Sequence, residues 1–212
     1  MINMKRFAFT MLELVFVIIV IGILAVLAMP NFNRHPLQEA AEQVAGHIRY
    51  TQHLAMVDDK FDDKNSTWYM SRWQIRFPYT TINGEKIYYY EVFSDENQQG
   101  NSDVFEEAID PLTRQTIGDG ANAIGSIPAS AMVNLTKKFG IIALSGSCNV
   151  LSGASYRPIS FDNLGRPYEG VYSGIYTNPI PVGGCTILLQ HKTDGNATIT
   201  ISQETGYVSV TY

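Results

Sequence analysis

The sequence begins with an apolar run that decides much of what this chain can fold into. Between residues 9 and 29, only Thr10, Glu13 and Gly22 interrupt the apolar character. A helix rises about 1.5 Å per residue, so a helix over this run is roughly 30 Å long, the thickness of a bilayer core. We therefore predict a transmembrane helix over residues 9–30.

Basic residues give this helix an expected orientation. Lys5 and Arg6 precede the run, and the next basic residue is Arg34. The positive-inside rule then predicts a cytoplasmic N-terminus and a periplasmic remainder, anchored by one pass through the inner membrane. A signal anchor or a cleaved secretory signal would share this pattern, and Val26-Leu27-Ala28 offers small residues at the spacing that signal peptidase prefers.

Glu13 distinguishes the run from a plain anchor. A carboxylate inside an apolar span costs on the order of 2–3 kcal/mol, so an acid at such a place predicts a function. The segments Lys5-Arg6-Phe7-Ala8 and Phe9-Thr10-Met11-Leu12-Glu13 resemble the class III leader and the mature N-terminus of type IV pilins and pseudopilins. A bacterial filament subunit is what this resemblance implies.

The resemblance assigns roles to individual residues. Residues 1–8 would be a leader that prepilin peptidase removes between Ala8 and Phe9, with N-methylation of the new terminal Phe9. Glu13 would be the fifth mature residue, and Pro30 would occupy the position of the family's helix-kinking proline. Ala8 departs from the family, which usually has Gly before the cleavage site.

In that family the glutamate pairs with the terminal amine of a neighbouring subunit. Each charge is costly alone in lipid-like surroundings, and the two are favourable when paired. The resemblance thus implies that Glu13 pairs with the amine of a neighbour's N-methylated Phe9. The expected partners are prepilin peptidase, other pilin or pseudopilin subunits, the secretion or pilus assembly platform, and the inner membrane.

A second helix is expected over residues 31–57, continuing the first into the globular domain. We expect Pro30 and Pro36 each to bend it or to interrupt one backbone hydrogen bond. His47 and His53 are expected on its surface. Apolar residues recur at helical spacing and predict a face packed on a sheet: Leu37, Ala41, Val44, Ile48 and Ala55.

Residues 58–212 are predicted to form a β-rich domain. Alternation of apolar and polar residues predicts strands at 68–77 and 87–93, with turn chemistry at Asn83-Gly84. Residues 94–131 are polar, acidic and too long for a hairpin, so we expect an insertion or a mobile functional loop. Further strands are expected at 139–144, 156–161, 185–191, 197–202 and 207–211. The predicted fold class is α+β, with a long N-terminal transmembrane helix, pilin-like, packed on an antiparallel sheet.

Two C-terminal segments narrow the resemblance. Residues 159–167, Ile-Ser-Phe-Asp-Asn-Leu-Gly-Arg-Pro, resemble a strand and turn of the GspH/FimT minor pseudopilins. Residues 199–210 resemble the closing hairpin of that family, and Glu204-Thr205-Gly206 should form its turn. An ordinary strand that ends in a glycine turn would also account for the sequence of residues 159–167.

Cys148 and Cys185 are the two cysteines of the chain. In an oxidising compartment they can form a disulfide that closes a loop of roughly 37 residues, which stabilises by about 3–4 kcal/mol in the chain-entropy model. Buried free thiols are the alternative at this stage.

Two polar patterns give further hypotheses. The acidic stretch 58–65 is either a solvated loop or a calcium loop; it lacks the spacing of an EF-hand, and we expect a loop without metal. Asn65 and Asn196 lie in Asp-x-Asn-x-Thr contexts, typical of an extended bacterial glycosylation sequon. Both asparagines are therefore candidate glycan acceptors.

The sequence contains no nucleophile elbow, metalloprotease motif or phosphate-cradling loop, so we expect neither an enzyme nor a cofactor. The net charge of −5 disfavours nucleic-acid binding. We expect a structural minor pseudopilin or pilin-like subunit of a type II secretion pseudopilus or a type IV pilus, priming assembly or contacting cargo. A FimT-like DNA-binding minor pilin and an unrelated membrane-anchored envelope protein are the alternatives.

Overall fold

The structure, a computed structural model, describes residues 10–28, 35–118, 130–148, 157–171 and 174–212. It divides into two compact units, Met1–Arg34 and His35–Tyr212. The second unit, called the body below, contains both four-stranded sheets and the whole hydrophobic core. The two units are described separately.

The first unit contains helix α1, Met11–Ala28. Its 18 residues span about 27 Å at 1.5 Å per residue, which is less than the roughly 30 Å that a bilayer core requires. Over the described residues, no helix is both long enough and apolar enough to cross a membrane. The predicted transmembrane helix over 9–30 is therefore wrong: the apolar run counted end residues that lie outside the described helix.

Helix α2, Pro36–Val57, is the helix that packs on the sheets. Pro36 occupies its first turn, where the missing N–H of proline has no partner to lose, so it begins the helix and does not bend it. The predicted apolar face is confirmed, because Leu37, Ala41, Val44, Ile48 and Ala55 are all buried. His47 is half-buried against Tyr90 and is not a surface residue, whereas His53 is exposed.

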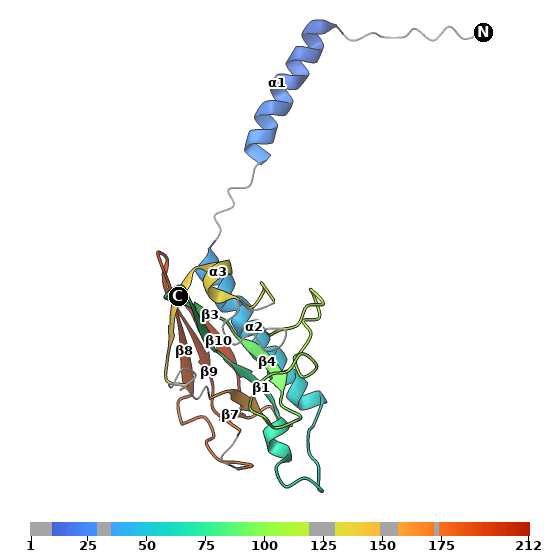
Figure 1. Cartoon of the computed structure of the whole chain (residues 1–212). Coiled ribbons are helices and arrows are strands. Elements are labelled where there is room, and N and C mark those ends of the chain that lie inside the picture. The colour runs from blue at the N-terminus through green and yellow to red at the C-terminus, as the bar shows by residue number, and fades with distance from the viewer. Residues whose placement is uncertain (1–9, 29–34, 119–129, 149–156, 172–173) are drawn as a thin grey trace, which may run out of the picture. The chain divides into compact units, whose positions relative to one another are not determined.

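Besides α2, the body contains two antiparallel four-stranded sheets (Figure 1). The first has the order β4-β1-β6-β7, with β4 at Glu91–Ser94, β1 at Trp73–Arg76, β6 at Ile159–Phe161 and β7 at Pro167–Glu169. The second has the order β10-β9-β8-β5, with β10 at Val208–Thr211, β9 at Gly195–Ile201, β8 at Cys185–His191 and β5 at Ile141–Ser145. Helix α2 contacts strands of both sheets, and buried residues of α2 and of both sheets belong to one hydrophobic core.

The region around Asn83-Gly84 differs from the prediction. A separate hairpin, β2 (Tyr79–Ile82) with β3 (Glu85–Tyr88), carries this turn, and both turn residues have positive φ as a two-residue hairpin requires. Strands β1 and β4 pair outside that hairpin. Residues Trp68–Ser71, predicted as strand, form a short 3-10 helix instead.

The antiparallel α+β character of the body is as predicted, and the transmembrane part of the fold class is not. The closing hairpin β9–β10 turns through Glu204-Thr205-Gly206, where Glu204 and Gly206 have positive φ. The sequence reasoning missed strand β7 and the short helix α3, Leu135–Phe139. Helix α3 begins at Asn134, whose side-chain oxygen accepts a 2.9 Å hydrogen bond from the N–H of Lys137.

Candidate functional site

The predicted assembly residues lie at the N-terminus, and the structure describes one of them. Ala8, Phe9 and Pro30 lie outside the described residues. Glu13 lies in the first turn of α1 and is exposed. The hydroxyl of Thr10, the residue just before α1, accepts a 3.2 Å hydrogen bond from the backbone N–H of Glu13.

This contact gives Glu13 a second structural context that the sequence reasoning did not consider. Thr10-x-x-Glu13 has the spacing of a capping box, in which the threonine hydroxyl satisfies the N–H three residues later. A carboxylate in the first turn is also favourable with the helix dipole. Any functional test of Glu13 must therefore separate its charge from helix capping.

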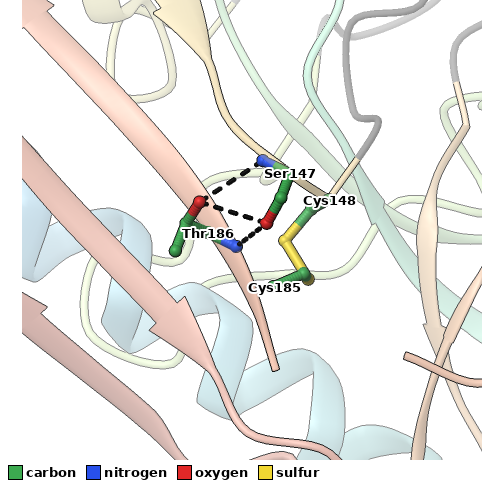
Figure 2. The surroundings of a disulfide bond; sticks show 4 residues. All are labelled: Ser147, Cys148, Cys185 and Thr186. Carbon is green, nitrogen blue, oxygen red and sulfur yellow. Dashed lines mark hydrogen bonds between the residues drawn. A yellow bond between two sulfur atoms is a disulfide. The ribbon is translucent and has the colours of Figure 1, made fainter. Parts of the chain in front are cut away.

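The predicted disulfide is confirmed: Cys148 and Cys185 are bonded and both are buried (Figure 2). The bond joins the segment after β5 to the first residue of β8. Neighbouring polar contacts hold the same junction, because the N–H of Thr186 donates to the hydroxyl of Ser147 at 3.0 Å and the N–H of Cys148 donates to the carbonyl of Thr186 at 3.2 Å.

A glycine allows the chain to reach this disulfide. Gly146 follows β5 with a φ of +140°, and a Cβ there would lie 2.0 Å from the carbonyl oxygen of Thr186. No side chain fits that space without moving the backbone of β8. Gly146 therefore brings Cys148 close enough to bond with Cys185.

The segment 159–167, on which the GspH/FimT resemblance rests, forms the hairpin β6–β7. Asp162 is the centre of its turn, with a side chain only 2% exposed. Its carboxylate accepts hydrogen bonds from the N–H of Leu164 at 3.0 Å and of Arg166 at 2.9 Å, and it pairs with the guanidinium of Arg166 at 2.7 Å. The Asp162 hydrogen bond raises the pKa of Arg166. The segment is thus a tightly bonded turn.

The two C-terminal segments of the resemblance meet on helix α2. The side-chain amide of Gln52 donates to the carbonyl oxygens of Gly165 and Thr205, each at 2.8 Å. Gly206 packs into the same place, since a Cβ there would lie 2.8 Å from the Gly165 oxygen. The turn of β6–β7 and the turn of β9–β10 therefore share one anchor on the helix.

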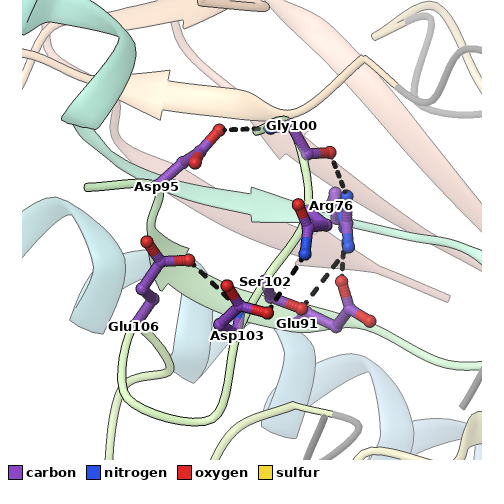
Figure 3. A network of polar contacts seen from close by, with 8 residues as sticks. Arg76, Glu91, Asp95, Gly100, Ser102, Asp103 and Glu106 are labelled. Carbon is purple, nitrogen blue, oxygen red and sulfur yellow. Dashed lines mark hydrogen bonds and ion pairs between the residues drawn. The ribbon is translucent and has the colours of Figure 1, made fainter. Parts of the chain in front are cut away.

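The described part of the long segment 94–131 is bonded to the first sheet (Figure 3). Arg76 of β1 pairs with the buried Glu91 of β4 and donates to the carbonyl of Gly100 at 3.0 Å. The carboxylate of Asp95 accepts the N–H of Gly100 at 2.8 Å. Burial raises the pKa of Asp95, against the opposing effect of these backbone hydrogen bonds. These contacts hold Gly100 against β1 and close the turn between Asp95 and Gly100.

The first residues of the acidic stretch 58–65 make specific contacts. Asp58 accepts from Trp73 Nε1 at 2.8 Å and pairs with Lys60 at 2.7 Å. Within the described residues no group of three His, Cys, Asp or Glu is arranged to hold a metal ion.

Asn65 is half-buried and accepts from the N–H of Thr67 at 3.0 Å, whereas Asn196 is exposed on β9. Glycosylation at both asparagines stays a prediction.

The described residues also form a cavity of about 410 Å³ that the sequence reasoning missed. Helix α2 forms one wall with Gly46, His47 and Tyr50, and the turn 110–113 forms another. The hydroxyl of Tyr90, buried behind the cavity, lies 2.7 Å from His47 Nδ1. His47 and Asp110 both line the cavity but are 63 positions apart in the sequence, so no local sequence pattern indicates that they lie close together.

Comparison with family models, with curated proteins and with solved structures gave no match.

Proposed function

We propose that this chain is a pilin-like structural subunit that assembles through its N-terminal helix into a type II secretion pseudopilus or a type IV pilus. Prepilin peptidase would prepare it by cutting between Ala8 and Phe9. The observation that carries the proposal is the pairing of a single charge, Glu13, with an otherwise apolar helix whose side chains are exposed from Met11 to Leu24.

Such a helix has a strong physical reason to associate. Full burial of one Leu, Ile or Val side chain is worth about 1.5–3 kcal/mol, and α1 exposes many of them along its length. Large exposed apolar surfaces mark places of interaction. A bundle of α1 helices from neighbouring subunits would bury this surface.

Glu13 would set the register of that bundle. A carboxylate in an apolar bundle is costly unless an opposite charge and hydrogen bonds accompany it. After cleavage the mature chain begins with an amine at Phe9, and a neighbour displaced along the bundle can bring that amine to Glu13. Correct subunit spacing would then be the arrangement that satisfies both charges.

The body fits a role outside the cytoplasm. Its bonded cysteines favour an oxidising compartment such as the periplasm. Loss of Lys5 and Arg6 with the leader would lower the net charge of −5 by a further two units. This acidity speaks against a phosphate backbone as partner and favours contacts with other subunits or a secreted cargo.

The matched variants Glu13→Gln and Thr10→Ala test the proposal. Glutamine can replace glutamate in a capping box but carries no charge, whereas Thr10→Ala removes the cap and keeps the charge. The readout is the fraction of subunit recovered in sheared filaments from the native cell. Glu13→Gln should reduce this fraction at least tenfold, and Thr10→Ala should leave it within about twofold of wild type. Equal incorporation of Glu13→Gln and wild type would contradict the proposal.

A further inference from the structure

We propose that the cavity between α2 and the turn 110–113 is a binding site for a small molecule with an aromatic or aliphatic body and one carboxylate. The site belongs to the body and does not depend on filament assembly. Its size of about 410 Å³ is within the range of ligand pockets in proteins.

Gly46 is the first observation that points to an occupant. It lies in the interior of the 22-residue helix α2, where glycine is less favourable than alanine. Apart from the adjoining backbone of α2, no atom of the described residues lies within 4 Å of the place where its Cβ would be, so close packing against them does not require glycine. Since Gly46 lines the cavity, its missing side chain leaves room for a ligand.

A chain of hydrogen bonds fixes the polar wall. Lys138 donates to the side-chain oxygen of Gln43 at 2.8 Å, and the amide nitrogen of Gln43 donates to the hydroxyl of Tyr90. The Tyr90 hydroxyl then has its proton available for His47 Nδ1, at 2.7 Å. In this arrangement the neutral imidazole of His47 carries its own proton on Nε2.

Burial keeps His47 neutral. Desolvation lowers the pKa of His47; Asp110 opposes this shift and Lys138 adds to it. The buried Tyr90 also stays protonated, because burial raises its pKa. The hydrogen-bond chain therefore has one protonation state around neutral pH.

Two side chains on the helical side of the cavity, His47 and Lys138, have unused hydrogen-bond donors. Among the described residues, His47 Nε2 makes no hydrogen bond, and Lys138 uses one of its three ammonium protons, on Gln43. On the opposite wall, the carboxylate of Asp110 accepts from the N–H of Leu112 at 3.1 Å and from the hydroxyl of Thr113 at 2.6 Å, so it is held within its own turn. A ligand with an acceptor group, and best a carboxylate facing Lys138, complements these donors.

Apolar side chains supply the rest of the wall. Pro111, Leu112 and Met132 line the cavity, and Leu112 is 91% exposed. A ring or branched chain in the cavity would contact these apolar side chains and be removed from water. The ligand therefore combines an apolar body with a single anionic end.

Naphthalene-2-carboxylate is the probe for this site. The body, residues 35–212, contains the whole core and the disulfide and is used for the measurement. We expect binding with a dissociation constant in roughly the 0.1–1 mM range, as is usual for about a dozen ligand atoms. In ¹H–¹⁵N NMR spectra the shifts should centre on Gly46, His47 and Leu112.

Variants and a second probe decide the outcome. Gly46→Leu should fill the cavity and abolish these shifts while its spectrum remains that of a folded body. Lys138→Met should weaken binding at least fivefold, whereas Lys137→Met should not, because the neighbouring Lys137 pairs with Glu85 and does not line the cavity. Unchanged binding to folded Gly46→Leu, no localised shifts at 5 mM probe, or equal binding of 2-naphthylmethylamine would each overturn the proposal.

Discussion

The side-chain amide of Gln52 donates a 2.8 Å hydrogen bond to the carbonyl oxygen of Gly165. The same nitrogen donates to the carbonyl of Thr205, also at 2.8 Å. One residue of α2 thus donates a hydrogen bond to a turn of each four-stranded sheet. The two segments that resemble the GspH/FimT pseudopilins, far apart in the sequence, meet at this amide.

Gln52→Ala should therefore destabilise the body. Loss of the amide leaves two carbonyl oxygens without their donor, and we expect a decrease in the free energy of unfolding of about 1–3 kcal/mol. Urea denaturation of the body measures it. His53→Ala, at the exposed neighbouring position, should change the value by less than about 0.5 kcal/mol. Equal effects of the two variants would show that Gln52 does not anchor the turns.

Removal of the disulfide should cost more. The bond closes a sequence separation of 37 residues, which corresponds to about 3–4 kcal/mol in the chain-entropy model. We expect a decrease of this size for the double variant Cys148→Ser, Cys185→Ser, and the same decrease for wild type in reducing agent. A reductant effect on the double variant itself would point to a cause other than this bond.

Gly146→Ala should destabilise the body by about 2–4 kcal/mol, because the new Cβ would meet the Thr186 carbonyl as well as an unfavourable φ. Gly170→Ala is the matched control: it has a positive φ, but beyond its chain neighbours a Cβ there meets no atom of the described residues within 4 Å, so only about 1–2 kcal/mol is expected. Both values come from denaturant unfolding. A cost for Gly146→Ala no larger than that of the control would refute the close approach.

The stability of the body should fall in mild acid because of His47. Burial lowers its folded pKa below 6.5, so between that folded pKa and 6.5 the unfolded chain binds a proton that the folded chain does not. Stability is then lost as pH falls below about 6.5, by up to about 1.4 kcal/mol per pH unit. Unfolding between pH 4.5 and 7.5 should show this slope in wild type and in His53→Gln. His47→Gln should have a flatter profile, and an unchanged slope there would contradict the assignment.

The sequence predicted those parts of the fold that depend on short-range patterns. The face of α2, strand β8 and the turn at Gly206 follow from spacing and turn chemistry, which act within a few residues. The bounds of α1, Met11–Ala28, did not follow, because the apolar run extends beyond both ends of the helix, from Phe9 to Met29. The Asn83-Gly84 turn was placed correctly, but its strands were not, since a hairpin inside a larger strand pair leaves the same alternation.

The candidate sites divide in the same way. Glu13 and the two cysteines were visible because their residue types are rare in their surroundings. The cavity beside Gly46 was not, because its walls come from α2, the turn 110–113 and Met132, which only the tertiary fold brings together. A glycine in the middle of an amphipathic helix was the one sequence signal that could have indicated it.

The mass of the mature N-terminus in protein from native cells tests the central claim most directly. The pilin-like account predicts a chain that begins with N-methylated Phe9, because prepilin peptidase cuts after Ala8. A chain that begins at Met29 would mean that signal peptidase removed Glu13 with the apolar run, and it would contradict the assembly role of that residue.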